Sequence, residues 1–338
     1  MRLLEVRALK TFYKVQEGLV RAVDGVSFGI EAGSMVGLVG ESGCGKTTVG
    51  RSIIRVLPRN GYMTAQGIMF KGRDLTRLTE KEMRLLRWTE IAVVPQSAMN
   101  SLDPVYCIED QMLEVLTRRG GLTRSVAIAR AAELFNEVGL DPSRLRSYPH
   151  ELSGGMKQRA IIAMAIALKP SFIIADEPVT ALDVIVQDRV LKIFKCLQQE
   201  MNITVMMITH DMSVIAQTCD AVIVMYAGRV VETGPTRDVF KRPHHPYTMG
   251  LKNAFPNLTE PADRLVSIPG DPPDMLTPVE GCPFADRCPF RYGKCRDVIP
   301  PLEEVASGHR VACIRKDTVN EMRLKAQEVE TWQRVTPS

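Results

Sequence analysis

Short runs of apolar, mostly β-branched residues recur along the first two thirds of the chain, and stretches with apolar residues at helical spacing separate several of them. Such runs are typical of strands buried on both faces of a sheet that helices cover. We expect these strands at 34–40, 91–96, 171–178, 203–210 and 221–228. Shorter runs at 3–9, 25–30 and 67–70 predict a smaller antiparallel layer. The pattern therefore indicates an α/β fold with a largely parallel sheet.

The hydrophobic pattern changes after residue 96. The sequences IEDQMLEVLTRRG, at 108–120, and SVAIARAAELFNEVGL, at 125–140, carry apolar residues at helical spacing. They predict a helical insertion into the sheet domain, at about 97–165. Past residue 255, prolines become dense and the periodicity is lost. We therefore expect two domains, a sheet domain at 1–255 and a small, irregular module at 256–338.

Composition and charge narrow the class of protein. The 338 residues are 45% hydrophobic, which is enough to bury a core, and carry a net charge of +4. This excess is too small to indicate a nucleic-acid partner. The N-terminus does not combine a basic stretch with an apolar run and a cleavage site, so we expect no export signal and a cytosolic location. The longest apolar run, at 160–168, is shorter than the roughly 18 residues of a membrane helix.

The sequence GESGCGKT follows a predicted strand and precedes the helical run TTVGRSIIRVL, as expected for a phosphate-binding loop. Its glycines let backbone N–H groups face phosphate oxygens, while Lys46 neutralises the outer phosphates and the Thr47 hydroxyl coordinates Mg²⁺. An ordinary glycine-rich turn is the alternative. We also expect Lys46 to lower the pKa of Cys44. The expected nucleotide contacts are Gly40, Glu41, Ser42, Gly43, Cys44, Gly45, Lys46, Thr47 and Thr48.

A pair of acidic residues ends the predicted strand in FIIADEP. Asp176 is placed to hold Mg²⁺ through water, and Glu177 is placed to polarise the attacking water as a general base. Many strands end in an acidic residue, so this pair alone is weak evidence for a nucleotide site. It becomes strong evidence because a phosphate-binding loop precedes it in the chain. Together the two motifs predict a nucleotide site that hydrolyses its ligand.

A third motif, LSGGMKQR at 152–159, leads into the helical run AIIAMAIAL. Ser153 is expected to cap this helix, and the amides of Gly154 and Gly155 then stand at its positive end, ready for an anion. An ordinary capped helix after a turn is the alternative interpretation.

Taken together, these motifs resemble those of the ATP-binding subunits of ABC transporters, over residues 1 to about 255. The resemblance implies a P-loop NTPase (RecA-like) core with an antiparallel β subdomain and a helical insertion, and hydrolysis of ATP with Mg²⁺. It also implies a dimer. In that dimer Ser153, Gly154 and Gly155 bind the γ-phosphate of an ATP held by the phosphate loop of the other subunit.

The resemblance implies roles for further positions. Tyr13 is similar to the aromatic residue that stacks on adenine, although the neighbouring Phe12 is an alternative and either ring could belong to the core. Gln96 resembles the residue that senses Mg²⁺ and the attacking water, so it is expected both at the metal and in catalysis. Asp183 ends TALD, which resembles the loop that crosses the dimer interface. His210 resembles the histidine that contacts the γ-phosphate.

Two segments resemble the peptide-importing branch of this family. They are SAMNSLDP, at 97–104, and PHHPYTMGL, at 243–251, and the chain carries one cassette without membrane helices. The resemblance implies an ATP-driven importer of di- or oligopeptides, with a paralogous second ATPase subunit as heterodimer partner, two membrane permeases and an extracytoplasmic substrate-binding protein. It places the chain peripherally on the cytoplasmic face of the inner membrane. Nickel or oligosaccharide import, or a soluble regulatory or repair ATPase, are the alternatives.

Four cysteines cluster near the C-terminus, with the spacing Cys282-x₅-Cys288-x₆-Cys295-x₁₇-Cys313. A reducing compartment disfavours disulfides, and four thiolates suit either zinc or an iron–sulfur cluster. The spacing leaves these two and chance open. The resemblance to peptide importers implies a [4Fe–4S] cluster, with Zn²⁺ as the alternative occupant.

Overall fold

The computed structural model describes residues 1–96, 101–254 and 267–333. The chain divides into two compact units, each of which is built from separate stretches of sequence. The first unit contains Met1–Leu3, Ile30–Met35 and Asp74–Ile208, and the second contains Leu4–Gly29, Val36–Arg73 and Thr209–Ser338.

Strands and helices alternate along much of the chain. The strands are β1 (Arg2–Val15), β2 (Gly18–Glu31), β3 (Met35–Val39), β4 (Gly61–Thr64), β5 (Gly67–Phe70), β6 (Arg73–Asp74), β7 (Ile91–Val94), β8 (Phe172–Asp176), β9 (Thr204–Thr209), β10 (Ala221–Tyr226), β11 (Arg229–Pro235), β12 (Glu303–Ala306) and β13 (His309–Val311). The helices are α1 (Lys46–Ile53), α2 (Glu80–Leu86), α4 (Ile108–Glu114), α5 (Arg124–Glu137), α6 (Gly154–Ile166), α7 (Val184–Met201), α8 (Met212–Thr218), α9 (Thr236–Lys241), α10 (Pro246–Asn253), α11 (Val319–Lys325) and α12 (Val329–Gln333). Short 3₁₀ turns lie at Pro142–Arg146, Pro149–Glu151, Ala285–Arg287, Gly293–Cys295 and Lys316–Thr318, and a π turn at Val115–Arg119 follows α4.

The first unit contains a parallel ladder. Strand β8 pairs with β7 on one side and with β9 on the other, in parallel. Every residue of β8 and β9 is buried, because both of these strands are covered on their two faces. This burial explains why their sequences are continuous apolar runs, and it confirms the strands expected at 91–96, 171–178 and 203–210.

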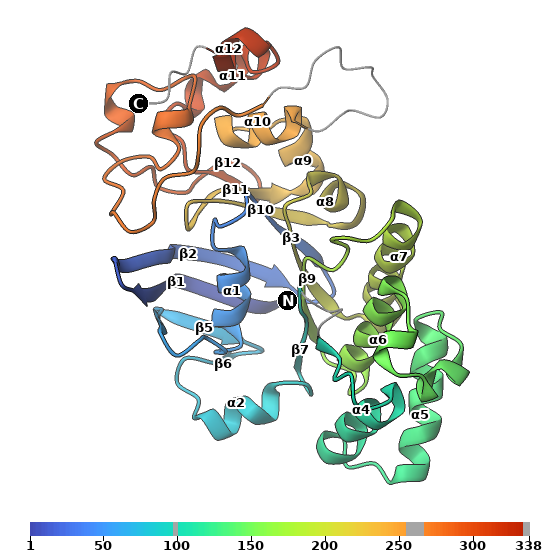
Figure 1. The fold of residues 1–338 in the computed structure, drawn as a ribbon. Helices are drawn as coiled ribbons and strands as arrows, with labels where there is room; N and C mark the ends of the chain where they lie inside the picture. The colour runs from blue at the N-terminus through green and yellow to red at the C-terminus, as the bar shows by residue number, and fades with distance from the viewer. Residues whose placement is uncertain (97–100, 255–266, 334–338) are drawn as a thin grey trace. The chain divides into compact units, whose positions relative to one another are not determined.

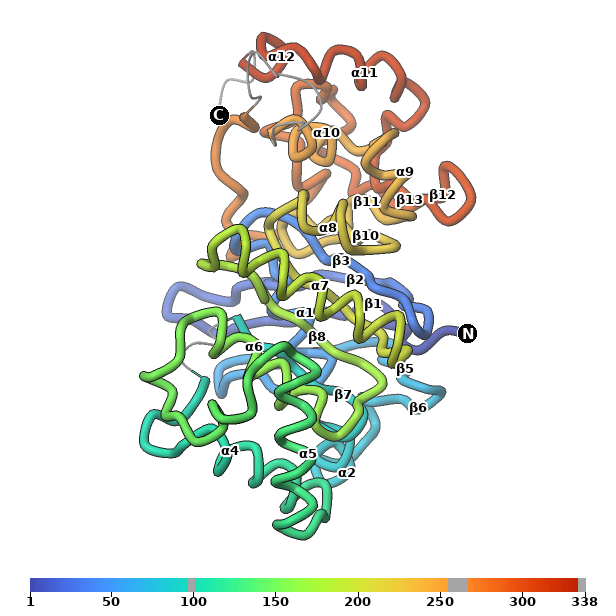
Figure 2. Tube along the Cα trace, turned by 90° about the vertical axis from the view of Figure 1, so that its right-hand side faces the viewer, coloured from blue at the N-terminus to red at the C-terminus, as the bar shows by residue number. Residues whose placement is uncertain are grey.

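The helices of the first unit confirm the expected helical pattern after Gln96. Helix α4 packs on α5, and α5 packs on α6 (Figure 2). The buried side of α5 is formed by Ala127, Ala131, Leu134 and Phe135, at the spacing that one helix face requires. Residues 97–100 lie outside the described residues, so the bounds of the insertion at 97–165 stay a prediction.

Helix α6 contains most of the longest apolar run of the sequence. Nine of its residues are buried, which accounts for the run as protein core. Across the described part of the chain, no helix combines the length and apolarity that crossing a bilayer requires.

The second unit contains the antiparallel layer and a second ladder. The layer has the strand order β2-β1-β5-β6, and β4 pairs with β1. Helix α1 packs beside β1, where the hydroxyls of Thr11 and Ser52 lie 2.8 Å apart (Figure 1). In the second ladder, β10 pairs in parallel with β3 and antiparallel with β11. The strands expected near 3–9, 25–30, 34–40, 67–70 and 221–228 are therefore confirmed.

The C-terminal segment is less irregular than the sequence suggests. Strands β12 and β13 form a hairpin, and β13 pairs with β11, where Val311 lies opposite Glu232. Helices α10 and α11 pack on one another. Trp332 of α12 is buried, and its indole N–H donates a hydrogen bond to the carbonyl of Ala326 at 2.9 Å. Sequence analysis missed these strands, whose backbone groups pair with each other and, for β13, with the distant β11. The expected domain boundary at residues 255 and 256 lies outside the described residues.

Candidate functional site

The predicted phosphate-binding loop connects β3 to α1 in the second unit. Gly45 is the N-cap of α1 and has φ of 98°, in the left-handed region. A Cβ at this position would lie 2.1 Å from the carbonyl oxygen of Ala22, so only glycine fits. Ser42 and Gly43 are exposed at the tip of the loop. The loop therefore has the tight backbone turn before a helix N-terminus that phosphate binding requires.

Lys46 is buried beneath the loop and faces its backbone. Its ammonium donates to the carbonyl of Gly40 at 2.7 Å and to the carbonyl of Glu41 at 2.9 Å. These contacts hold the positive charge within the curl of the loop, where it can also reach a bound phosphate.

The expectation of a lowered pKa at Cys44 is wrong. The Cys44 side chain is buried under the loop, and burial raises the pKa of its thiol. The positive charge of Lys46 opposes this shift but is the smaller effect. Burial destabilises the thiolate by removing its hydration, and this effect is larger than the stabilisation by the Lys46 ammonium. Cys44 is therefore a packing residue of the loop with low reactivity.

Tyr13 lies beside the helix that follows the loop. Its hydroxyl is 3.2 Å from the hydroxyl of Thr48, while the neighbouring Phe12 stacks on Tyr62 with ring centroids 5.2 Å apart. Of the two aromatic candidates, Tyr13 is thus the one that faces α1. His210, also of the second unit, follows β9 and is exposed.

The two acidic residues lie in the first unit, where β8 ends. Asp176 and Glu177 are both buried, and the amide of Glu177 donates to the carbonyl of Ile208 at 2.8 Å. Glu177 has φ of 50°, which is strained for a residue with a side chain. The hydroxyl of Thr180 donates to its carboxylate at 2.6 Å. Such strain is retained where a side chain must point in one direction, as a general base must.

The LSGG motif and the TALD sequence lie side by side in the first unit. The hydroxyl of Ser153 accepts a hydrogen bond from the amide of Met156 at 3.3 Å, which confirms the predicted cap of α6. Asp183 caps α7 in the same way, from the amide of Val186 at 2.9 Å. A Cβ on Gly155 would lie 2.3 Å from Val186, so the two helix N-termini pack closely.

The residues expected to hold magnesium belong to both units. Thr47 lies in α1 of the second unit, whereas Asp176 and Gln96 belong to the first. Gln96 follows β7 and is exposed. Each unit thus presents one part of the predicted chemistry: the loop and Tyr13 in one, the acidic pair and the LSGG motif in the other.

All four C-terminal cysteines line one cavity. Its walls include Cys282, Cys288, Cys295, Cys313, Phe284 and Phe290. Burial raises the pKa of Cys282 to about 12 and that of Cys313 to about 11. It also raises the pKa of Cys288 well above its usual value, and the neighbouring thiols add to each shift because thiolates repel one another. All eight cysteines are free thiols, so these four converge without a disulfide.

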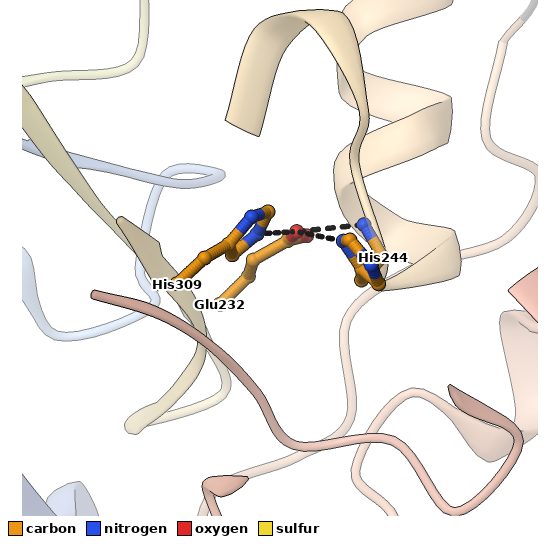
Figure 3. A group of neighbouring side chains, drawn as sticks. All are labelled: Glu232, His244 and His309. Carbon is orange, nitrogen blue, oxygen red and sulfur yellow. Dashed lines mark hydrogen bonds and ion pairs between the residues drawn. The ribbon is translucent and has the colours of Figure 1, made fainter. Parts of the chain in front are cut away.

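Glu232, His244 and His309 form a second group of metal-ligand type side chains (Figure 3). The carboxylate of Glu232 lies between the two imidazole rings and is fully buried. Its Oε1 accepts hydrogen bonds from Nε2 of His309 at 2.7 Å and from the amide of His244 at 2.6 Å, and its Oε2 accepts one from the amide of His245 at 2.9 Å.

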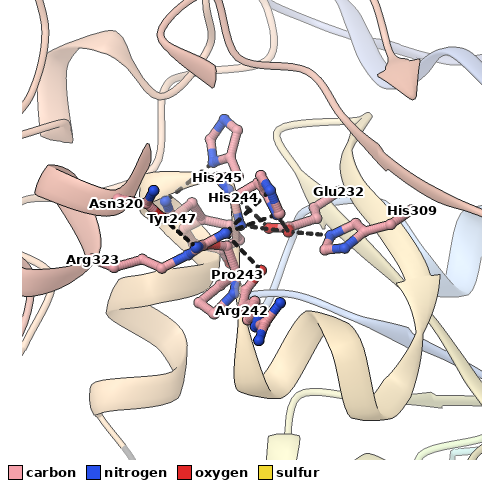
Figure 4. A network of polar contacts seen from close by, with 9 residues as sticks. All are labelled: Glu232, Arg242, Pro243, His244, His245, Tyr247, His309, Asn320 and Arg323. Carbon is pink, nitrogen blue, oxygen red and sulfur yellow. Dashed lines mark hydrogen bonds and ion pairs between the residues drawn. The ribbon is translucent and has the colours of Figure 1, made fainter. Parts of the chain in front are cut away.

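The surroundings of this group oppose a bound cation (Figure 4). The guanidinium of Arg323 lies 3.1 and 3.2 Å from the ring nitrogens of His244 and also donates to the carbonyl of Pro243 at 2.7 Å. A metal ion would have to displace the hydrogen bonds of Glu232 beside this positive charge. The group therefore joins β11, β13 and the start of α10 as a hydrogen-bonded network.

Sequence analysis missed two residues that contact the phosphate loop. Arg287 and Tyr247 both bind Glu41, from positions 246 and 206 residues further along the chain. No local pattern marks such contacts.

Comparisons with known proteins agree with this arrangement. The family model described as ABC transporter matches residues 23–180, and that described as the oligopeptide/dipeptide transporter C-terminal region matches residues 231–295. A probable peptide ABC transporter ATP-binding protein of Sinorhizobium fredii is 46% identical, over 94% of this chain and 96% of the relative. The dipeptide transport ATP-binding protein of Bacillus subtilis is 42% identical, over 94% of this chain and 95% of its own.

A more distant relative and a solved structure extend the comparison. The oligopeptide transport ATP-binding protein of Salmonella typhimurium is 41% identical, over 93% of both chains. The dimeric structure of an ATP-binding cassette in a post-hydrolysis state, bound to ADP and Pi, is 26% identical. It superposes with a TM-score of 0.62, over 69% of this chain and 99% of its own.

Proposed function

The chain belongs to the ATP-binding proteins of the ABC transporters that carry the oligopeptide/dipeptide C-terminal region, and from this premise we propose how its residues serve that role. It is an ATPase that energises the uptake of di- or oligopeptides, as its relatives at 41–46% identity indicate. The observation that carries the proposal is the phosphate-binding loop, in which glycine conformation and the buried Lys46 together form a receptor for phosphates.

Each predicted site residue has a role in ATP hydrolysis. The amides of the loop from Gly40 to Thr48 and the Lys46 ammonium bind the phosphates, and Tyr13 stacks on adenine. Thr47, Asp176 and Gln96 hold Mg²⁺, which neutralises charge on the phosphates. Glu177 accepts a proton from the attacking water, and Gln96 and His210 orient that water and the γ-phosphate.

A dimer completes the proposed site. Ser153, Gly154 and Gly155 at the start of α6 contact the γ-phosphate held by a second subunit, and Asp183 lies at the interface. This proposal is supported by exposed apolar residues next to these helix starts: Val184 is 82% and Ile185 is 69% exposed. Apolar side chains of this kind at a helix start favour burial against a partner. We infer that the partner is a paralogous ATPase.

Membrane permeases and an extracytoplasmic substrate-binding protein are the further partners, with the chain bound peripherally to the membrane on its cytoplasmic face. The docking surface we propose lies in the helical insertion. Val105 and Tyr106 are exposed there, and the amide of Ile108 donates to the carbonyl of Ser147 at 3.0 Å, which brings the exposed Tyr148 close to them.

Isolation of the intact complex tests this function. We expect the chain to co-purify from membranes with hydrophobic permeases, and peptides presented with the binding protein to stimulate its ATPase activity. Nickel and oligosaccharides serve as substrate controls, and stimulation by either one in place of peptides would overturn the peptide assignment. Co-purification with nucleic acid instead of permeases would refute an importer.

We infer further that the four C-terminal cysteines hold a [4Fe–4S] cluster. All four side chains line one cavity and form no disulfide, and four thiolates suit such a cluster. A bound cluster would supply a crosslink between four thiolates in a segment with little regular structure.

Metal analysis tests this centre. After purification without oxygen we expect about four iron and four acid-labile sulfide per chain, as a [4Fe–4S] centre contains. Cys288→Ser should lower both contents, whereas Cys196→Ser, which changes a thiol of α7, should leave them unchanged. Zinc without sulfide would contradict the cluster.

A further inference from the structure

Glu41, the second residue of the phosphate-binding loop, is held at two points, by Arg287 of the turn Ala285–Arg287 and by Tyr247 of α10. Arg287 donates from Nη1 to Oε2 at 2.6 Å and from Nη2 to Oε1 at 3.0 Å. The amide of Glu41 donates to the hydroxyl of Tyr247 at 2.8 Å. An arginine with both terminal nitrogens on one carboxylate forms a planar, directional pair. Both the side chain and the backbone of Glu41 are therefore fixed from outside the loop.

The same residue contacts the phosphate-binding lysine. The carbonyl of Glu41 accepts a hydrogen bond from Lys46 Nζ at 2.9 Å. A displacement of Glu41 would thus move a group that positions the Lys46 ammonium. Since phosphate binding depends on the placement of this charge and of the loop amides, small shifts there weaken ATP binding.

The charge of Glu41 is the second reason why Arg287 matters. A carboxylate in a phosphate-binding loop repels the phosphates of ATP, and the guanidinium of Arg287 neutralises it. The Arg287 side chain is 8% exposed and that of Glu41 is 24% exposed, so water and salt screen this pair only partly. Without Arg287 the carboxylate of Glu41 would lose the cation that pairs with it.

The packing of the cysteine segment, residues 282–313, positions the side chain of Arg287. It ends the turn Ala285–Arg287, directly before Cys288, and its Nε donates to the carbonyl of Pro269 at 2.9 Å. Phe284, which precedes this turn, packs edge-on against Tyr226 with ring centroids 5.2 Å apart, and the Tyr226 hydroxyl accepts from Arg287 at 3.2 Å. The conformation around the cysteines thus determines where the guanidinium lies.

We propose that Arg287 is a positioning residue that couples the cysteine segment to ATP binding, because it neutralises Glu41 and fixes it in the phosphate loop. The inference rests on the proposed function, since it requires that the loop binds ATP. The coupling is reciprocal: ATP binding stabilises the segment around Cys288 by the same factor by which that segment strengthens ATP binding.

The affinity of the assembled transporter for ATP tests the proposal. Arg287→Gln should raise the Kd for ATP about tenfold or more, because a charged pair loses one partner. Arg287→Lys should lose less, since it keeps the charge but not the paired geometry. Arg291→Gln is the matched control, because it removes the same group from the same segment, where Arg291 pairs with the exposed Asp286.

A double substitution separates positioning from general damage. If Arg287 acts through Glu41, the Glu41→Gln/Arg287→Gln chain should regain most of the lost ATP affinity. Equal Kd values for ATP in Arg287→Gln and Arg291→Gln would overturn the proposal. So would a double variant whose loss of binding free energy equals the sum of the losses in the two single variants. Failure of the unmodified chain to bind ATP would instead refute the proposed function.

Hydrogen exchange of the unmodified chain keeps the test independent of any variant's folding. A non-hydrolysable ATP analogue should slow amide exchange at 282–288, as reciprocity requires. Equal exchange with and without the analogue, in a chain that binds it, would show that the segment and the nucleotide are uncoupled.

Discussion

Glu177→Gln should leave ATP binding intact and slow steady-state hydrolysis about 10²- to 10³-fold, because the amide cannot accept a proton from the attacking water. The two side chains have nearly the same size and shape. The substitution keeps the backbone hydrogen bond to Ile208 and an oxygen that can accept from Thr180. The effect should therefore fall on the rate of hydrolysis alone, measured as phosphate release beside a direct ATP-binding assay.

The matched control is Glu200→Gln, the same chemical change at an exposed position of α7 in the same unit. It should hydrolyse ATP at the rate of the unmodified chain. Steady turnover by Glu177→Gln at that rate would remove Glu177 from the role of general base, whatever its strained backbone suggests.

Glu232→Ala should lower the thermal midpoint by roughly 5–10 °C, because three donors, two of them buried, lose their acceptor at about 1–3 kcal/mol each. The donors are the Nε2–H of His309 and the amides of His244 and His245. His245 and His309 are buried, so water cannot replace the carboxylate as the acceptor for their N–H groups. Thermal unfolding of the purified chain measures the shift.

Glu321→Ala is the control for this change. Glu321 is exposed and pairs with Lys325 on the surface of α11, so its loss should shift the midpoint little. Equal midpoints for the two variants would contradict the structural role of Glu232. A loss of stability on treatment with EDTA that Glu232→Ala abolishes would show that a metal occupies the group.

The elements that the sequence predicts well are those whose signal is local. The runs that became β8 and β9 are apolar throughout because both faces of each strand are covered. Ser153 and Asp183 cap their helices through bonds to amides three residues later. Local signals failed for β12 and β13, because β12 pairs with β13, and β13 pairs with the distant β11, where Thr233 lies 77 residues before its partner Arg310.

The sequence by itself determined the phosphate-binding loop, the acidic pair, the capped LSGG helix and the cysteine spacing, because each depends on residues a few positions apart. Only the tertiary structure decided the environment of these groups. Burial, which cannot be read from the sequence, raises the pKa of Cys44, although the positive charge of Lys46 lowers it. The contacts of Glu41 with Arg287 and of Glu232 with His309 join residues 246 and 77 positions apart. Contacts at such separations form only when the packed core brings distant strands and turns together, and that is the physical reason why one sequence read alone does not reveal them.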